Sequence, residues 1–236
     1  LLRGLPAWAA DADVGAALAT RWAHVDMPTG SGKTLLLAGR ALAAGERTEV
    51  WVTEPTIASA RNIHGVLAGT IGQDPRRPTW VGYGAGGRFE YASATPVKIM
   101  TAGHAVNRLL AGLAGRGPLP DVLVLDEMHH PSTDSYVALC LARHAVFDRD
   151  LPVRVAVASA TLDPAAVGVP TAAVVRLGPA PRRFPVKLVE PPRRDHDPVY
   201  SAALEECTGM ARRAIEEHGG SGIVFVAGEE CAVTLA

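Results

Sequence analysis

The sequence is poor in cysteine and has no long hydrophobic run, and each shortage excludes a class of protein. Its three cysteines, Cys140, Cys207 and Cys231, lie far apart, so we expect neither a disulfide framework nor a paired-cysteine metal site. No apolar run approaches the ~18 residues of a membrane-spanning helix, and no signal-peptide pattern is present. We therefore expect a protein without a membrane segment, located in the reducing cytoplasm.

An excess of charge of either sign is also lacking, because 23 basic and 24 acidic residues give a net charge of −1. This balance excludes a protein that binds nucleic acid over a globally basic surface, but it does not exclude a local basic groove. Lysine is scarce among the basic residues, with Lys33, Lys98 and Lys187 as its only occurrences. Lys33 lies in a glycine-rich segment, which makes it a candidate to bind phosphate groups.

Apolar, β-branched segments alternate along the chain with segments rich in Ala and Leu, and 48% of the 236 residues are hydrophobic. This alternation predicts an α/β fold with a mostly parallel sheet and helices on both of its faces. The predicted strands are residues 23–26, 50–53, 79–82, 97–101, 122–126, 153–159 and 173–176. The predicted helices are residues 11–20, 33–44, 57–70, 104–114, 135–145 and 199–218.

A connector rich in Pro and Arg, residues 178–198, predicts a domain boundary. We expect residues 1–181 to form one complete domain and residues 182–236 to begin a second, incomplete one. A single strand–helix–strand unit cannot close a core of its own. The chain begins with Leu1 rather than Met, so we expect it to be a piece of a longer protein.

A glycine-rich turn, TGSGKT, joins the first predicted strand to the helix after it. Gly30 and Gly32 allow backbone N–H groups to turn toward a phosphate, and the following helix N-terminus adds partial positive charge. Lys33 would neutralise the β- and γ-phosphates, and Thr34 would bind Mg²⁺. The residues predicted to bind nucleotide are Thr29, Gly30, Ser31, Gly32, Lys33 and Thr34. The strict phosphate-loop pattern has glycine where this chain has Met27, and an ordinary strand-to-helix turn is the alternative.

Two acidic residues, Asp126 and Glu127, follow the most apolar predicted strand, which begins with Val122-Leu123-Val124-Leu125. Ligands of open α/β sheets bind at the carboxyl ends of the strands. Asp126 would hold Mg²⁺ through water, and Glu127 would orient or deprotonate an attacking water. A helix N-cap is the alternative for such a pair.

Together, and in this order, the motifs resemble those of superfamily 2 DExH/DEAH-box RNA helicases. The matching segments are TGSGKT at 29–34, TEPT at 53–56, VGY and RFE at 81–90, MTAG at 100–103, DEMH at 126–129 and SAT at 159–161. The stretch DEMHHPSTDS at 126–135 is closest to the helicases of flavivirus-type viral polyproteins. The resemblance implies a RecA-like P-loop domain followed by the start of a second one. It also implies an NTP-dependent RNA helicase core in a larger protein such as a viral polyprotein, with ATP or another NTP and Mg²⁺ as cofactors.

The resemblance also assigns roles to individual residues. The implied catalytic residues are Lys33, Asp126, Glu127 and His129, of which Asp126 and Thr34 would bind Mg²⁺. The residues implied to couple hydrolysis to nucleic-acid movement are Ser159 and Thr161. The implied contacts with the backbone of single-stranded RNA are Pro55, Thr56, Thr101, Ala102 and Gly103.

The chain departs from the family pattern in two ways. It has no glutamine-containing motif that would read adenine, and it lacks the arginine-finger motif of the second domain. We therefore expect the rest of that domain to come from the longer chain and this chain alone to hydrolyse NTP poorly. Three alternatives are a catalytically weak scaffold that binds RNA and NTP, a DNA-acting superfamily 2 translocase, and another P-loop enzyme such as a small-molecule kinase.

Overall fold

The structure is a computed structural model that describes residues 15, 18–27, 32–43, 48–74, 80–129, 132–160, 173–176, 208–210, 212–213, 215–217 and 219. Contacts within the chain divide it into two compact units, Leu1–Arg183 and Phe184–Ala236. In the second unit, residues 208–210, 212–213 and 215–217 are helical. Apart from these residues and residue 219, that unit lies outside the described part of the chain, so a second RecA-like domain starting at residue 182 stays a prediction.

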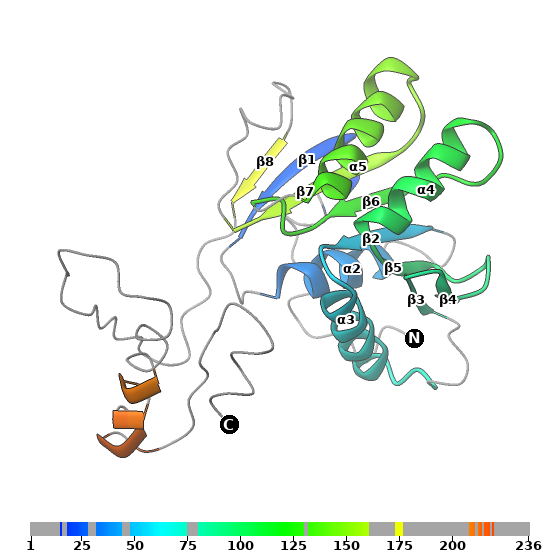
Figure 1. The fold of residues 1–236 in the computed structure, drawn as a ribbon. Helices are drawn as coiled ribbons and strands as arrows, with labels where there is room; N and C mark the ends of the chain where they lie inside the picture. The colour runs from blue at the N-terminus through cyan, green and yellow to red at the C-terminus, as the bar shows by residue number, and fades with distance from the viewer. Residues whose placement is uncertain are drawn as a thin grey trace. The chain divides into compact units, whose positions relative to one another are not determined.

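Within the described residues, the first unit is built on an eight-stranded sheet (Figure 1). Its strands are β1 (Trp22–Asp26), β2 (Val50–Glu54), β3 (Val81–Ala85), β4 (Arg88–Glu90), β5 (Val97–Thr101), β6 (Val122–Leu125), β7 (Arg154–Ser159) and β8 (Ala173–Arg176). Their order across the sheet is β4-β3-β5-β2-β6-β7-β1-β8, and every neighbouring pair is parallel except β3 and β4. This arrangement confirms the predicted α/β fold with a mostly parallel sheet and is consistent with one RecA-like domain.

In the described part of the chain, two helices cover each face of the sheet (Figure 1). One face carries α2 (Lys33–Ala43) and α3 (Ile57–Thr70), and the other carries α4 (Ala102–Leu113) and α5 (Thr133–Arg143). Buried residues of the first layer include Val25, Leu37, Val52 and Leu67, and those of the second include Leu109, Leu123, Leu139 and Val157. None of the described helices is long and apolar enough to cross a membrane.

A two-residue turn joins β3 to the edge strand β4. Both turn residues, Gly86 and Gly87, have positive φ angles, 56° and 77°, as the type I′ turn of a tight hairpin requires. The sequence-based prediction placed a strand at 79–82 and none at 88–90, so it missed β4. Gly82 and Gly84 weaken the strand pattern of β3, yet they leave room for Tyr91, which packs against both.

Helix boundaries differ from the predictions by one or two residues where caps decide them. The start of α4 moves from residue 104 to Ala102, because Thr101 already has the extended backbone of an N-cap. Similarly, α5 begins at Thr133, where the Ser132 side chain accepts a hydrogen bond from the Ser135 N–H. A π-helical turn, His144–Asp148, follows α5. Of the helix predicted at 11–20, residues 15, 18 and 19 are described and helical.

The carboxyl ends of five parallel strands, β5, β2, β6, β7 and β1, lie along one edge of the sheet. The register pairs Glu54 of β2 with Thr101 of β5, and Thr53 with Leu125 of β6. On the other side of β6, Leu125 pairs with Val157 of β7. This edge therefore gathers the residues that follow β2, β5 and β6 beside the start of α2.

Candidate active site

Lys33 opens α2, and its side chain reaches the end of β6. Its Nζ lies 2.5 Å from Oε1 of Glu127 and 3.9 Å from Oδ1 of Asp126, and the residue is only 4% exposed. Gly32 before it has a φ of 77°, a left-handed conformation that favours glycine. The other predicted loop residues, 29–31, lie outside the described part. A buried ammonium paired with carboxylates is positioned to bind an incoming anion.

Thr34, the next residue of α2, donates a hydrogen bond from its hydroxyl to Oδ2 of Asp126. The backbone N–H of Glu127 donates to the other carboxylate oxygen of Asp126 at 2.8 Å. Burial raises the pKa of Asp126, while the Thr34 hydrogen bond and the Lys33 charge oppose that shift. The two residues predicted to bind Mg²⁺ are therefore brought together.

The chemistry of this pair fits Mg²⁺, which binds in nucleotide sites through one or two protein oxygens and the phosphates of the substrate. The hydroxyl of Thr34 and the carboxylate of Asp126 are oxygen ligands of that kind. Among the described residues, no group of three or more His, Cys, Asp or Glu side chains could hold a metal ion. Thr34 and Asp126 would hold a magnesium ion together with the phosphates of a nucleotide.

Glu127 lies between two cationic or potentially cationic groups. One carboxylate oxygen contacts Lys33, and the other lies 3.2 Å from Nδ1 of His129. Its φ of 56° is rare for a residue with a side chain. The four predicted catalytic residues therefore form one cluster at the end of β6, although their roles stay predictions.

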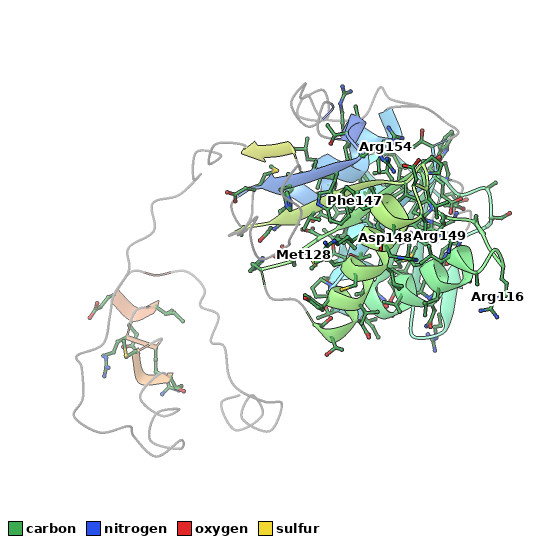
Figure 2. The ribbon with its side chains drawn as sticks, turned by 90° about the horizontal axis from the view of Figure 1, so that it is seen from above. Arg116, Met128, Phe147, Asp148, Arg149 and Arg154 are labelled. Carbon is green, nitrogen blue, oxygen red and sulfur yellow. The ribbon has the colours of Figure 1, made fainter. Side chains whose placement is uncertain are left out.

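Neighbouring residues fix this cluster to the sheet. Met128 is buried and donates its N–H to the Ala158 carbonyl at 3.2 Å. Figure 2 shows Met128 at the end of the first unit opposite Arg116. Ser159, a predicted coupling residue, is fully buried at the end of β7, and its carbonyl accepts the Met27 N–H at 3.0 Å. Thr161, the other predicted coupling residue, lies outside the described residues.

The two segments predicted to contact nucleic acid end neighbouring strands. Pro55 and Thr56 follow β2 and are exposed, and Thr56 caps α3 through reciprocal hydrogen bonds with Ser59. Thr101 ends β5 in register with Glu54, at the start of α4. The structure thus brings the two segments together at one edge.

Ala102 and Gly103, the other two residues of this second segment, are less exposed than Pro55 and Thr56. Ala102 is buried, with 3% of its surface exposed. Gly103 packs against α5, because a Cβ at Gly103 would lie 2.5 Å from Oδ2 of Asp134. Any contact with nucleic acid there would be made by the backbone.

Sequence reasoning missed Glu54, which lies beside this cluster. It ends β2, is 3% exposed, and has a buried Oε1 without a hydrogen-bond partner. Burial raises its pKa to about 8, and the nearby charge of Asp126 adds to that shift. The sequence signal that could have pointed to Glu54 is an acidic residue that closely follows the apolar segment Val50-Trp51-Val52.

A family model described as DEAD/DEAH box helicase matches residues 11–167. That range covers the whole cluster from Lys33 to Ser159. No curated protein sequence matches the chain.

Two similar solved structures come from Escherichia coli. A crystal structure of the DEAH/RHA helicase HrpB matches with a TM-score of 0.71 and 24% identity, over 93% of this chain and 27% of that chain. A structure of the DExH-box NTPase HrpB matches with a TM-score of 0.67 and 25% identity, over 93% of this chain and 26% of that one. The chain thus spans about a quarter of the length of these proteins.

Proposed function

The chain belongs to the DEAD/DEAH box helicase family, and from that premise we propose that it is the NTP-binding core of an RNA helicase. The reaction proposed is hydrolysis of ATP or another NTP with Mg²⁺, coupled to movement on single-stranded RNA. Members of the family generally bind ATP with Mg²⁺ and act on nucleic acid. The choice of RNA is supported by the sequence segments that resemble DEAH-box RNA helicases.

One observation carries this proposal. The start of α2 contacts the residues that follow β6 through two side-chain pairs, Lys33–Glu127 and Thr34–Asp126. The members of each pair are more than 90 residues apart in sequence. Phosphoryl transfer needs an ammonium, a hydroxyl and carboxylates beside the phosphates. These groups lie here at the carboxyl edge of a parallel sheet, where ligands of such sheets bind.

The resting geometry indicates how these residues would act. A triphosphate binding at Lys33 would take over the ammonium that now contacts Glu127, leaving the Glu127 carboxylate free to accept a hydrogen bond from water. Glu127 would hold that water in line with the γ-phosphorus and accept its proton as the oxygen attacks, while the bond from the γ-phosphorus to the bridging oxygen breaks and the nucleoside diphosphate leaves. Asp126 and Thr34 would hold Mg²⁺, which would supply positive charge to the phosphate oxygens. His129, 3.2 Å from Glu127, would help to orient the carboxylate.

The test is NTP hydrolysis by the full gene product, with and without single-stranded RNA or the matching DNA. We expect RNA to stimulate hydrolysis more than DNA, because only RNA carries a 2′-OH. Lys33→Ala and Glu127→Gln should each lower kcat by about 10²-fold or more, as losses of transition-state groups do.

Asp148→Asn is the matched control for loss of a carboxylate, because Asp148 is exposed on the π-helical turn and bonds only to His144 among the contacts of the described residues. It should keep wild-type kcat. An inactive wild type that still binds RNA and NTP would favour the scaffold alternative, and equal stimulation by DNA would favour a translocase acting on DNA.

Two further parts of the proposal concern the longer chain and its location. We propose that a longer chain supplies the rest of a second RecA-like domain, which is supported by the quarter of HrpB that this chain spans. The proposed location is cytoplasmic, in keeping with the three dispersed cysteines. A viral polyprotein origin gains no support from the similar structures, both of which are bacterial.

A further inference from the structure

The first turn of α4 carries the second predicted nucleic-acid segment, and α4 itself does little to stabilise that turn. Thr101, its N-cap, forms no side-chain capping hydrogen bond with the described helix, and none of the described first-turn residues is acidic. Gly103 lies in this turn, where glycine is a poor helix former. Contacts from outside the helix must therefore hold the turn in place.

Tyr91, which follows β4, bridges the first two turns of α4. Its hydroxyl oxygen lies 2.9 Å from Nε2 of His104 and 3.2 Å from Nη1 of Arg108. A guanidinium can only donate, so Tyr91 accepts from Arg108 and can give its own proton to His104. That arrangement requires Nε2 of His104 to be unprotonated, as in a neutral imidazole. One hydroxyl thus ties the first turn of α4 to the second and both to the segment between β4 and β5.

Two glycines of β3 leave the space for this contact. A Cβ at Gly82 would clash with the Cβ of Tyr91. A Cβ at Gly84 would lie 3.0 Å from Cε1 of Tyr91 and 3.3 Å from Nε2 of His104. The two rings meet edge to face, with their centroids 6.4 Å apart. Both rings therefore lie close to the backbone of β3, which places the hydroxyl within reach of α4.

Arg108, the donor to Tyr91, is itself held by the neighbouring strand β2 and the residue before it. Its guanidinium lies 4.5 Å from the centroid of the Trp51 ring, a cation–π distance, and its Nη2 lies 3.9 Å from Oε1 of Glu49. The same carboxylate oxygen binds the buried Lys98 of β5 at 2.5 Å. Because Arg108 is fixed in this way, the direction of its hydrogen bond to Tyr91 is fixed as well.

The charges around His104 favour its neutral form. Burial lowers the pKa of His104, and the nearby charge of Arg108 lowers it further. The other charged side chains that neighbouring elements bring to this region are Lys98 on β5, 5.7 Å from the centroid of the Tyr91 ring, Glu49 before β2, and Asp134 on α5 beside Gly103. His104 is therefore neutral near pH 7 and gains its proton only at pH values below the usual 6.5.

We propose that Tyr91 is a positioning residue for nucleic-acid binding, whose hydroxyl holds the first turn of α4 so that the backbone of residues 101–103 is presented to RNA. This inference rests on the proposed function. Protonation of His104 removes the acceptor for the Tyr91 proton. It also places a positive charge beside Arg108 and near the N-terminus of α4, where the helix dipole disfavours it. The contribution of Tyr91 to RNA binding is therefore present at neutral pH and lost in acid.

The test measures the Kd of the full gene product for single-stranded RNA at pH 8 and at pH 5, at one salt concentration. At pH 8 we expect Tyr91→Phe to raise this Kd about threefold to tenfold, as loss of one hydrogen bond does. At pH 5 its Kd should agree with that of wild type within about twofold, because wild type has lost the same contact. A role of Tyr91 in packing alone would not make the two Kd values converge.

His104→Gln is the converse variant, because its amide oxygen can accept from Tyr91 but does not titrate. We expect it to bind RNA like wild type at pH 8. At pH 5 it should bind at least about threefold more tightly than wild type, because only wild type loses the acceptor.

Tyr136→Phe and His144→Gln are the matched controls for loss of a phenol hydroxyl and of an imidazole. Tyr136 is exposed on α5, and His144 lies on the π-helical turn, where it contacts Asp148. Each control should keep the wild-type Kd at both pH values.

The inference is overturned if folded Tyr91→Phe keeps the wild-type Kd at pH 8, if its defect persists at pH 5, or if a control shows the same loss. Should Tyr91→Phe fail to fold, His104→Gln decides, and a Kd equal to that of wild type at pH 5 overturns the inference. A wild type that binds no RNA at either pH overturns the proposed function and this inference with it. A wild type that binds RNA, with both variants unchanged, overturns the inference alone.

Discussion

At the scale of single residues, Glu127 has a backbone conformation that side-chain-bearing residues rarely adopt, with a φ of 56°. Such a conformation costs on the order of 1–3 kcal/mol, and it persists only where surrounding contacts impose it. Here the neighbouring contacts are the Met128 N–H on the Ala158 carbonyl and the Lys33 ion pair. Strain at this position supports a role for Glu127 in chemistry rather than in packing.

Glu54 makes stability depend on pH. Burial raises its pKa from 4.5 to about 8, the charges of Asp126 and Glu127 add to the shift, and Ser59 and Lys33 oppose it. The folded protein therefore holds a proton that the unfolded chain releases, so the contribution of this group to stability falls as the pH rises through that window. We expect Glu54→Gln to gain stability relative to wild type from about pH 5 to about pH 8, by a few kcal/mol at most. Thermal melts across this range measure it, and a Tm difference independent of pH would contradict it.

Sequence reasoning located Lys33 and Asp126 because their signals are local. A glycine-rich turn before a helix and an acidic residue after an apolar strand are visible in a few consecutive residues. Sequence reasoning did not identify Glu54 as a site residue, because its burial depends on β5 and β6. These two strands flank β2 and come from distant parts of the chain. No short window of sequence contains that information.

At the scale of elements, the bounds of α3 agree with the prediction for a local reason. Thr56 and Ser59 form a capping box, in which each side chain accepts from the backbone N–H of the other. The edge strand β4 was missed because its three residues are too few to show an alternating pattern. Its signal was the Gly86-Gly87 pair, which favours a type I′ hairpin.

The same hairpin makes Gly82 sensitive to substitution. A Cβ at Gly82 would clash with the Cβ of Tyr91 and lie 2.9 Å from the Glu90 carbonyl oxygen. We therefore expect Gly82→Ala to lower the free energy of unfolding by about 1–3 kcal/mol, as overpacking does. Chemical denaturation of the purified protein measures this loss.

Gly65→Ala serves as the matched control for that substitution. Gly65 is exposed in α3, and a Cβ there would have no neighbour within 4 Å. Replacing a helical glycine by alanine should leave stability unchanged or raise it by up to about 1 kcal/mol. If both variants lost the same free energy of unfolding, close packing at β3 would not be the cause of the loss in Gly82→Ala.

At the scale of the whole molecule, the described residues that are predicted to bind nucleotide or Mg²⁺ all belong to the first of the two units. Gly32, Lys33 and Thr34 lie at the start of α2, and Asp126 directly follows β6. We therefore expect nucleotide to bind to, and stabilise, the first unit.

Nucleotide should accordingly raise the Tm of the first unit. At about 100 times its Kd, a ligand specific for the folded state adds about 2.7 kcal/mol. We expect Mg²⁺ with a non-hydrolysable NTP to give such a shift, and EDTA to reduce it. Lys33→Ala should lose most of it, whereas Arg149→Ala, which removes an exposed positive charge, should keep it. Differential scanning calorimetry measures the shift, and a full shift in Lys33→Ala would contradict the site.

The contact between Lys33 and Glu127 has a consequence for affinity. Glu127 is in effect a competing anion attached to the protein, because a triphosphate must displace its carboxylate to reach the ammonium. The wild-type Kd for nucleotide therefore includes the work of that displacement. Glu127→Gln removes the competitor, so the variant that hydrolyses nucleotide slowly should also bind it more tightly. The resting protein would thus give up nucleotide affinity while the carboxylate proposed to activate water stays paired with Lys33.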